Sequence, residues 1–404
     1  MFKKIAIKTG VLTTVFILAV IVSSYVTNRG NTDMSADMGG ATLPRISFMT
    51  EGYEVNSLPG YKSDMTLTSM RDTLTPVTNN QLDMNIAKYD NQIQKVYWQV
   101  YTLNGKKCIQ EGTIKDVQDT VTLNFRNTKI LKEERILKVT LYLDNQNIYF
   151  YTRIKNSADC NYKASLDFAN NFHSAALEGQ GDKIESYLET DTDSDADSST
   201  YQEVTLASTQ AQVLWGSLAP QVSGNVYWEI KECNENYTSL VLKFQVKCAG
   251  DTDYADRLYS VKEFFRIRTG EDAQQYLLDY DRTMNQRFDG KTTALNQKGV
   301  LVGIAPTELE YETNTDGTIV AFIEDNQLWH YDKKADEMSL VFGFADAENM
   351  DVRTLCDLHD IRLISVDEKG NTTFTVVGYM NRGVHEGQVG VAVYYFDAEK
   401  NSVT

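Results

Sequence analysis

The segment Val96-Tyr97-Trp98-Gln99-Val100-Tyr101-Thr102-Leu103-Asn104-Gly105 contains the clearest fold signal in this sequence of 404 residues. Val96, Trp98 and Val100 occupy alternate positions, which places them on one face of a β-strand. The dipeptide Asn104-Gly105 predicts a tight hairpin turn, because both residues readily adopt positive φ. The segment therefore predicts a half-buried strand in an antiparallel sheet.

Strands of this kind recur on both sides of the segment. Short alternating runs separated by turn residues extend over residues 43–157, which predicts a β-sandwich of immunoglobulin-like size. A second strand-rich region covers residues 201–290. It includes Val226-Tyr227-Trp228-Glu229-Ile230, which is similar to residues 96–100. Domain duplication and chance similarity both remain open, and Trp98 and Trp228 are expected in the cores.

The hydrophobic period changes between these two regions. Leu166, Ala169, Phe172 and Ala176 recur every three or four residues, which predicts one or two short helices that break at residues 179–181. A polar, acidic stretch follows. Residues 158–200 are therefore expected to form a helical spacer and an acidic linker.

Two aromatic strands dominate the C-terminal region. Leu328-Trp329-His330-Tyr331-Asp332 and Val393-Tyr394-Tyr395-Phe396-Asp397 each precede a turn and a short return strand. This arrangement is typical of the outer hairpin of a β-propeller blade, although a generic β-meander is the alternative. Two blades cannot close a ring. We therefore expect a chain shortened relative to its relatives at Thr404, or a second chain that completes the sheet.

The N-terminus has the charge pattern of a membrane anchor. Lys3, Lys4 and Lys8 precede an uncharged, mainly apolar stretch at residues 9–28, which is long enough to cross a bilayer. The lysines place residues 1–8 in the cytoplasm and the remainder outside. A cleaved signal peptide, cut near residues 22–24, is the alternative. The sequence thus predicts a single-pass cell-membrane protein that contacts the lipid bilayer through residues 9–28.

Composition limits the possible partners. The net charge of -17 argues against nucleic acid, because phosphate binding requires clustered lysine and arginine. Five cysteines leave at least one thiol free, and Cys248, which continues the apolar face of a strand, is expected to be a core thiol. Cys356 and His359 are expected in a turn, because structural zinc needs further ligands that the sequence does not supply.

Two groups of residues are candidates for ligand binding. The glycine-rich loop at residues 381–390 brings together Arg382, His385 and Glu386, so it is either a binding loop or a structural loop. Trp215 and Trp329 are candidate surface aromatics that could stack on sugars. No P-loop, GxGxxG, GxSxG or CxxC motif is present, so no catalytic residue and no cofactor is predicted.

An acidic repeat provides a weak calcium alternative. Asp191, Asp193, Asp195 and Asp197 follow the alternate spacing of calcium loops. The EF-hand pattern fails, because Ala196 stands where glycine is needed and Gln202 where glutamate is needed. A solvated acidic linker is favoured, and no metal site is predicted.

Three further stretches support a family resemblance. They are Arg45-Ile46-Ser47-Phe48-Met49-Thr50-Glu51-Gly52, Met70-Arg71-Asp72-Thr73-Leu74-Thr75-Pro76 and Gly378-Tyr379-Met380-Asn381-Arg382-Gly383-Val384-His385-Glu386-Gly387. With the anchor, they resemble an uncharacterised family of large single-span membrane proteins of Gram-positive anaerobic bacteria, with a propeller-like C-terminal region. The resemblance implies no catalytic residues, and it implies that such chains continue beyond this point.

The expected protein is mainly β, with an N-terminal transmembrane helix, β-sandwich domains, a short helical insert and partial β-propeller-like blades. Its expected function is binding or scaffolding in the cell envelope, with other envelope proteins or wall glycan as partners. An extracytoplasmic glycan-active enzyme and a regulator of a membrane sensor kinase are the alternatives. The expected segments are a cytoplasmic tail (1–8), a transmembrane helix (9–28), a linker (29–42), a β-sandwich (43–157), a helical spacer and acidic linker (158–200), a second β domain (201–290) and incomplete blades (299–404).

Overall fold

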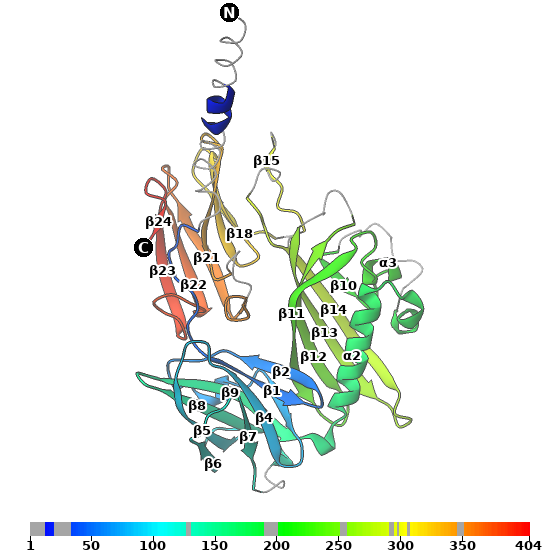
Figure 1. The fold of residues 1–404 in the computed structure, drawn as a ribbon. Helices are drawn as coiled ribbons and strands as arrows, with labels where there is room; N and C mark the ends of the chain where they lie inside the picture. Colours follow the sequence, from blue (N-terminus) through cyan, green and yellow to red (C-terminus); the bar gives the residue numbers. More distant parts are fainter. Residues whose placement is uncertain are drawn as a thin grey trace, which may run out of the picture.

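The structure is a computed structural model that describes residues 13–19, 34–126, 131–189, 201–250, 257–290, 295–296, 299–304, 308–345 and 351–404. It is mainly β and contains several sheets (Figure 1), which confirms the predicted fold class at this level. Among the described residues, no helix is both long and apolar enough to cross a membrane. Most of the predicted anchor at residues 9–28 lies outside the described residues; residues 13–19 of it are helical.

The largest sheet has nine strands in the order β10-β14-β13-β12-β11-β2-β1-β4-β7. It continues across the two β regions predicted from the sequence, because β2 and β11 pair in parallel at Val55 and Trp228. Both side chains are buried in one shared core. The strands are β1 (Arg45–Thr50), β2 (Tyr53–Leu58), β4 (Gln81–Ala87), β7 (Thr120–Asn124), β10 (Glu203–Thr205), β11 (Pro220–Cys233), β12 (Thr238–Cys248), β13 (Leu258–Thr269) and β14 (Gln275–Gln286).

A five-stranded sheet shares that core, in the order β3-β9-β8-β5-β6. The predicted hairpin joins β5 to β6, and Gly105 in its turn has a φ of 71°. Trp98 is buried as predicted, and its ring packs edge-on against Phe125. A Cβ at Gly112, the residue opposite Trp98, would lie 2.5 Å from the indole, so only glycine fits there. The strands are β3 (Leu74–Val77), β5 (Ile93–Thr102), β6 (Cys108–Ile114), β8 (Arg135–Leu143) and β9 (Asn147–Asn156).

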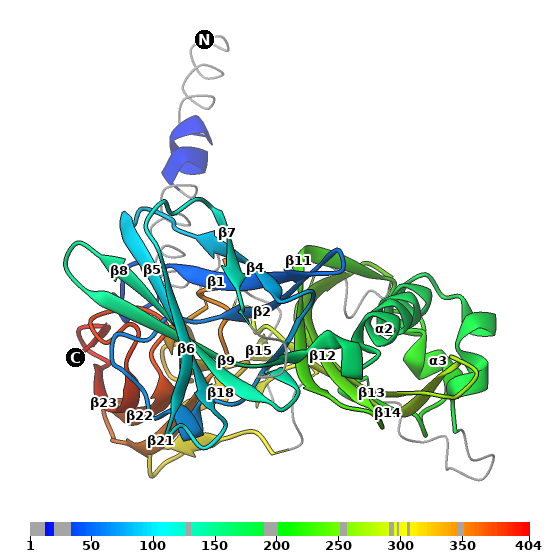
Figure 2. The same ribbon diagram turned by 90° about the horizontal axis from the view of Figure 1, so that it is seen from below.

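Helix α2 (Tyr162–Leu177) covers one face of the strands β11 to β14 (Figure 2). It buries the apolar positions at 166, 169, 172 and 176 that predicted it. A disulfide between Cys160 and Cys233 ties the start of this helix to the end of β11. The sequence did not predict this bond, whereas Cys248 is a free, buried thiol as expected. The short helices are η1 (Leu67–Ser69), η3 (Ser157–Asp159), η4 (Gly181–Lys183), η5 (Glu185–Tyr187) and α3 (Gln210–Val213).

The C-terminal region contains two four-stranded antiparallel sheets, each with its strands in chain order. They pack against each other through a common hydrophobic cluster and lie side by side in Figure 1. We call them the first C-terminal sheet, with β17 (Tyr311–Thr313), β18 (Ile319–Glu324), β19 (Gln327–Asp332) and β20 (Glu337–Gly343), and the second C-terminal sheet, with β21 (His359–Val366), β22 (Thr372–Tyr379), β23 (Val389–Asp397) and β24 (Ser402–Val403). A separate two-stranded sheet pairs β15 (Leu295–Asn296) with β16 (Gly299–Val300).

Residues 34–42, which the sequence assigns to a linker, lie against the first C-terminal sheet. The backbone N–H groups of Ser35 and Ala36 donate to the carbonyl oxygens of Leu340 and Val341 on β20, at 2.9 and 3.0 Å. Ala36 is buried, and Met34 and Met38 pack beside it. This part of the chain is therefore fixed to the C-terminal sheets before it enters β1.

Candidate interaction surface

The loop between β22 and β23 contains three of the predicted site residues. Arg382 and Glu386 are buried, whereas His385 is exposed. Arg382 donates to the carbonyl oxygens of Gly39 and Gly343, each at 3.2 Å. His385 instead contacts the side chain of Gln388 through Nδ1 at 3.2 Å. The structure thus brings Arg382 and Glu386 to the same N-terminal segment but leaves His385 apart from them.

Glu386 fixes the chain just before β1. Its carboxylate accepts hydrogen bonds from the backbone N–H of Thr42 at 2.7 Å, from the Thr42 hydroxyl at 2.5 Å and from the backbone N–H of Leu43 at 3.0 Å. Charge-assisted hydrogen bonds of this kind are stronger than neutral ones. These contacts give the loop a structural role within the chain. A structural loop was one of the two alternatives that the sequence left open, and a binding loop was the other.

The two predicted surface tryptophans are buried, so the expectation of surface exposure is wrong. Trp215 is completely buried, and the guanidinium of Arg282 lies over its ring at 3.8 Å from the centroid. Trp329 is covered by Phe288, at 4.8 Å between ring centroids. In each case the covering group comes from a distant part of the chain. Local sequence around each tryptophan does not reveal such a partner.

The four aspartates of the calcium alternative, Asp191, Asp193, Asp195 and Asp197, lie outside the described residues. In the part of the chain that is described, no group of three or more His, Cys, Asp or Glu side chains could hold a metal ion. His359 begins β21 and is buried, and this burial lowers the pKa of its imidazole to about 4.

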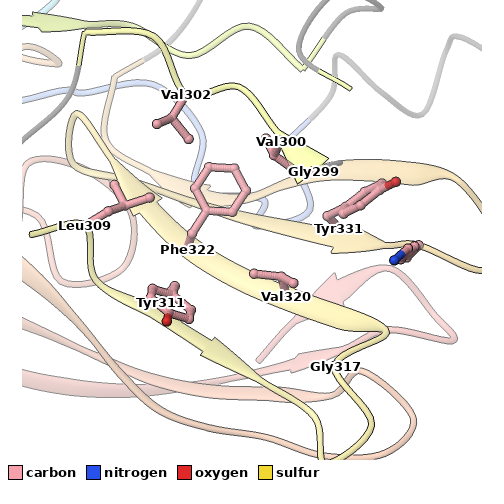
Figure 3. Close-up of a pocket in the computed structure, with 10 residues that line it drawn as sticks. Gly299, Val300, Val302, Leu309, Tyr311, Gly317, Val320, Phe322 and Tyr331 are labelled. Atoms are coloured by element: carbon pink, nitrogen blue, oxygen red, sulfur yellow. The ribbon is translucent and has the colours of Figure 1, made fainter. Parts of the chain in front are cut away.

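One open pocket, of about 310 Å³, lies on the first C-terminal sheet (Figure 3). Phe322 and Tyr331 form part of its wall, and Tyr311 stands at the edge strand β17. The charged side chain in the lining is Lys333, and the lining contains no carboxylate. Of the aromatic rings in the lining, that of Tyr311 is exposed, whereas those of Phe322 and Tyr331 are buried. Its remaining lining residues are Gly299, Val300, Val302, Leu309, Gly317 and Val320.

A buried carboxylate lies at the end of β18, at the tight turn to β19. Both oxygens of Glu324 are buried without a hydrogen-bond partner. Burial, and then the neighbouring charge of Asp325, raises the pKa of Glu324 to about 8. Burial also raises the pKa of Asp325 to about 6, although Ser260 on β13 donates a hydrogen bond to it at 2.8 Å. These carboxyl groups lie where the first C-terminal sheet meets the nine-stranded sheet.

The outer side of strand β23, in the second C-terminal sheet, is apolar and exposed. On β23, Val391 and Val393 are each 66% exposed, and Tyr395 is 42% exposed. Val377 on β22 pairs with Val391 and is exposed as well. Ile364 on β21 and Val389 add to the exposed apolar side chains of this sheet. We call Val377, Val389, Val391, Val393 and Tyr395 the outer face.

The sequence of β23 contains a pattern that could have identified this surface. Residues 389–396 are apolar or aromatic at odd and even positions alike, Gly390 apart. Strands that are apolar on both sides are typical of sheets covered on both faces. In the structure, the described residues cover the side with Tyr394 and Phe396, and the side with Val391 and Val393 is exposed. The outer face is therefore the candidate functional surface, because exposed contiguous apolar patches mark interaction sites.

The structure defines a mainly β protein with several sheets and an exposed apolar surface on one of them. Comparisons with known proteins do not assign it to a family. No protein-family model matches the chain, and no curated protein matches it. Among solved structures, it is similar to a quinonprotein alcohol dehydrogenase-like protein from Bacteroides thetaiotaomicron. The identity is 9%, the match covers 85% of this chain and 95% of that one, and the TM-score is 0.15. A similarity of this size supports no conclusion about fold or function.

Proposed function

We propose that this chain is a membrane-anchored scaffolding protein of the cell envelope, which binds other envelope proteins through the outer face. The observation that supports this proposal most directly is the exposure of Val391 and Val393 on β23, where each pairs with a residue of β22. Each fully buried valine side chain contributes about 1.5–3 kcal/mol relative to an exposed one. A partner that covers the outer face would recover this free energy, which makes binding the role that this surface fits.

The proposed anchor is residues 9–28, with the bulk of the chain outside the cytoplasm. Val15, Phe16, Ile17 and Leu18 are consecutive in the helical residues 13–19, and each is more than half exposed. Such a helix buries all sides only in an apolar surrounding, and a lipid bilayer provides one. The lysines at positions 3, 4 and 8 support an orientation with the N-terminus in the cytoplasm.

We further propose that the two C-terminal sheets are blades of a propeller-like arrangement. Each is an antiparallel meander of four strands, and the two pack face to face. Propeller blades have this strand order and this mode of packing. The proposal places the binding surface at the open end of a stack of sheets.

The anchor and the surface are tested separately in cells that express the full chain. Phe16→Asp with Leu18→Asp is expected to release the protein from membranes washed with carbonate. Val391→Lys with Val393→Lys is expected to retain the anchor but to lose the envelope proteins that co-purify after cross-linking. Thr122→Lys with Asn124→Lys, on the exposed side of β7, is the matched control. If the wild type, the Val391→Lys/Val393→Lys variant and the β7 control recover equal amounts of these partners, the proposed function is contradicted.

The pocket supports a second role, the recognition of wall glycan. Tyr311 is 62% exposed at the rim of the pocket, and aromatic rings can stack on the faces of sugars. Purified peptidoglycan should sediment the wild-type protein, and Tyr311→Ala should reduce the bound fraction. If both proteins sediment equally, or neither does, the pocket has no such role.

A further inference from the structure

We infer that the outer face binds one kind of partner: a further four-stranded antiparallel sheet that presents a row of aromatic side chains. This inference rests on the proposed function and specifies the partner. It is based on a structural repeat between the two C-terminal sheets, which shows what covers the corresponding surface of the first one.

The repeat is visible first in the turns. Asn314 follows β17 and Asp367 follows β21, and each carbonyl accepts a hydrogen bond from a glycine N–H three residues later, at 3.1 and 3.0 Å. Asp332 and Asp397 end β19 and β23. The carboxylate of each accepts the backbone N–H three residues later, at 3.1 and 3.0 Å. The fourth residue after each, Asp336 or Asn401, has positive φ.

Strand pairing then sets the residue correspondence. Phe322 pairs with Trp329 in the first sheet, and Phe374 pairs with Tyr394 in the second. Two residues later, Tyr331 corresponds to Phe396, since each is the residue just before the turn aspartate. Each sheet therefore has an aromatic row on the equivalent face, which consists of Phe322, Trp329 and Tyr331 in the first sheet and Phe374, Tyr394 and Phe396 in the second.

The aromatic row of the second sheet covers the back of the first. Phe374 and Tyr394 contact Phe342 on β20, with ring centroids 5.3 and 5.0 Å apart. Phe396 contacts His330 on β19, at 5.2 Å between centroids. Leu328, on the same back face, is fully buried. An aromatic row is therefore the complement that a back face of this type accepts.

The outer face is the back face of the second sheet. By the same correspondence, Val393 stands where Leu328 stands in the first sheet, and Tyr395 stands where His330 stands. Leu328 and His330 are buried, but Val393 and Tyr395 are exposed. The same position in the repeat thus has a covering sheet in one case and solvent in the other. The missing complement is another aromatic row on a sheet.

A second copy of this chain does not supply that row from its described residues. Its second row is already packed on the first sheet. Its first row is covered by Phe288, Val300, Val302 and Leu309. A second copy would have to displace these residues before it could bind. The partner is therefore a sheet of a different protein.

A photo-cross-linker identifies the partner directly. The full chain with p-benzoylphenylalanine in place of Val393 is irradiated in the membranes of cells that make it, and the cross-linked peptide is sequenced by mass spectrometry. Thr122, exposed on β7, is the control position. The expected product is about fivefold more abundant than at Thr122, because contact requires atoms within about 4 Å. It should map to a strand with aromatic residues at alternate positions.

The outcomes separate the two proposals. Cross-linking to a strand with an aromatic row in a second protein supports the inference, whereas a link within one polypeptide, recognised by its gel mobility, overturns it. Cross-linking to a protein site without such a row overturns the inference but leaves the proposed scaffolding function intact. A homodimeric product also overturns the inference. A yield no greater than at Thr122 contradicts both.

Discussion

The two C-terminal sheets have the same strand order and share two of their three turns, yet they bury different amounts of their surface. The first sheet is covered on both sides, by Phe288, Val300, Val302 and Leu309 on one face and by the second sheet on the other. The second sheet is covered on one side, and its outer face is exposed. Equivalent positions therefore differ in environment while the backbone is alike.

The two sheets also differ in one connection between strands and at one buried position. The first sheet has a tight two-residue turn between β18 and β19, with positive φ at Asp325 and Asn326. The second sheet has the loop 380–388 at the same place, and this loop fixes residues 34–43. A buried carboxylate, Glu324, occupies one sheet where Val376 occupies the other. Each contrast can be tested by substitution.

The largest effect is expected from the interface between the sheets. Phe374→Ala removes a fully buried ring that contacts Phe342, and a change of this kind costs about 3–5 kcal/mol. The loss should appear as faster amide hydrogen exchange in β22 and a lower urea midpoint. Tyr395→Ala, an aromatic on the exposed side of the neighbouring strand, is the control, with about 0.5 kcal/mol expected. Similar losses from both variants would show that the two faces do not differ as described.

The free energy of unfolding is expected to depend on pH through Glu324 in the first sheet. Val376, at the matching position of the second sheet, does not titrate. The pKa of Glu324 is raised, so the folded state binds the proton more tightly than the unfolded state. Stability is therefore fully present below the ordinary pKa of a glutamate and is lost as the pH rises towards about 8. The free energy of unfolding should fall by about 2–4 kcal/mol over this window.

The variant Glu324→Gln isolates this contribution. Asp325, with its pKa raised to about 6, has the same sign and remains in both proteins. Unfolding by urea at pH 5 and pH 8 should therefore show a smaller difference in the variant than in the wild type. Equal pH dependence in the two proteins would rule out a buried, proton-binding Glu324.

The loop of the second sheet is expected to have a moderate effect. Glu386→Ala leaves the N–H groups of Thr42 and Leu43 without their acceptor, which costs about 1–3 kcal/mol when the donors remain buried. Amide exchange at these two residues should rise. His385→Ala changes an exposed neighbour in the same loop and should leave their exchange unchanged. An equal rise in both variants would assign the effect to the loop backbone.

Much of the fold could be predicted from local patterns. Alternation located β5, the aromatic run at residues 393–397 located β23, Asn104-Gly105 located a turn, and the spacing of Leu166, Ala169 and Phe172 located α2. The parallel contact between Val55 and Trp228 could not be predicted. It depends on two strands that are far apart in the chain, and short sequence patterns contain no information on such pairing.

The candidate site was predicted less well, for a related reason. Arg382 and Glu386 were identified as unusual, but Glu386 binds Thr42 and Arg382 binds Gly39, each more than 300 positions away. Trp215 was expected at the surface, because nothing near it in the sequence indicates the guanidinium of Arg282. The outer face was missed because the apolar pattern of β23 predicts burial on both sides. Such a pattern is typical of a strand in a sheet that is covered on both faces.

The smallest effect on stability is expected at the outer face itself. Val391→Lys with Val393→Lys should change the free energy of unfolding by no more than about 0.5 kcal/mol, because both side chains are exposed. The same variant should bind less of an apolar fluorescent dye such as ANS, since it removes the centre of the patch. Thr373→Lys, a half-buried position on the same side of β22, is the paired control. A large loss of stability in the double variant would mean that the two valines are already covered within the chain, and the contrast between the sheets would disappear.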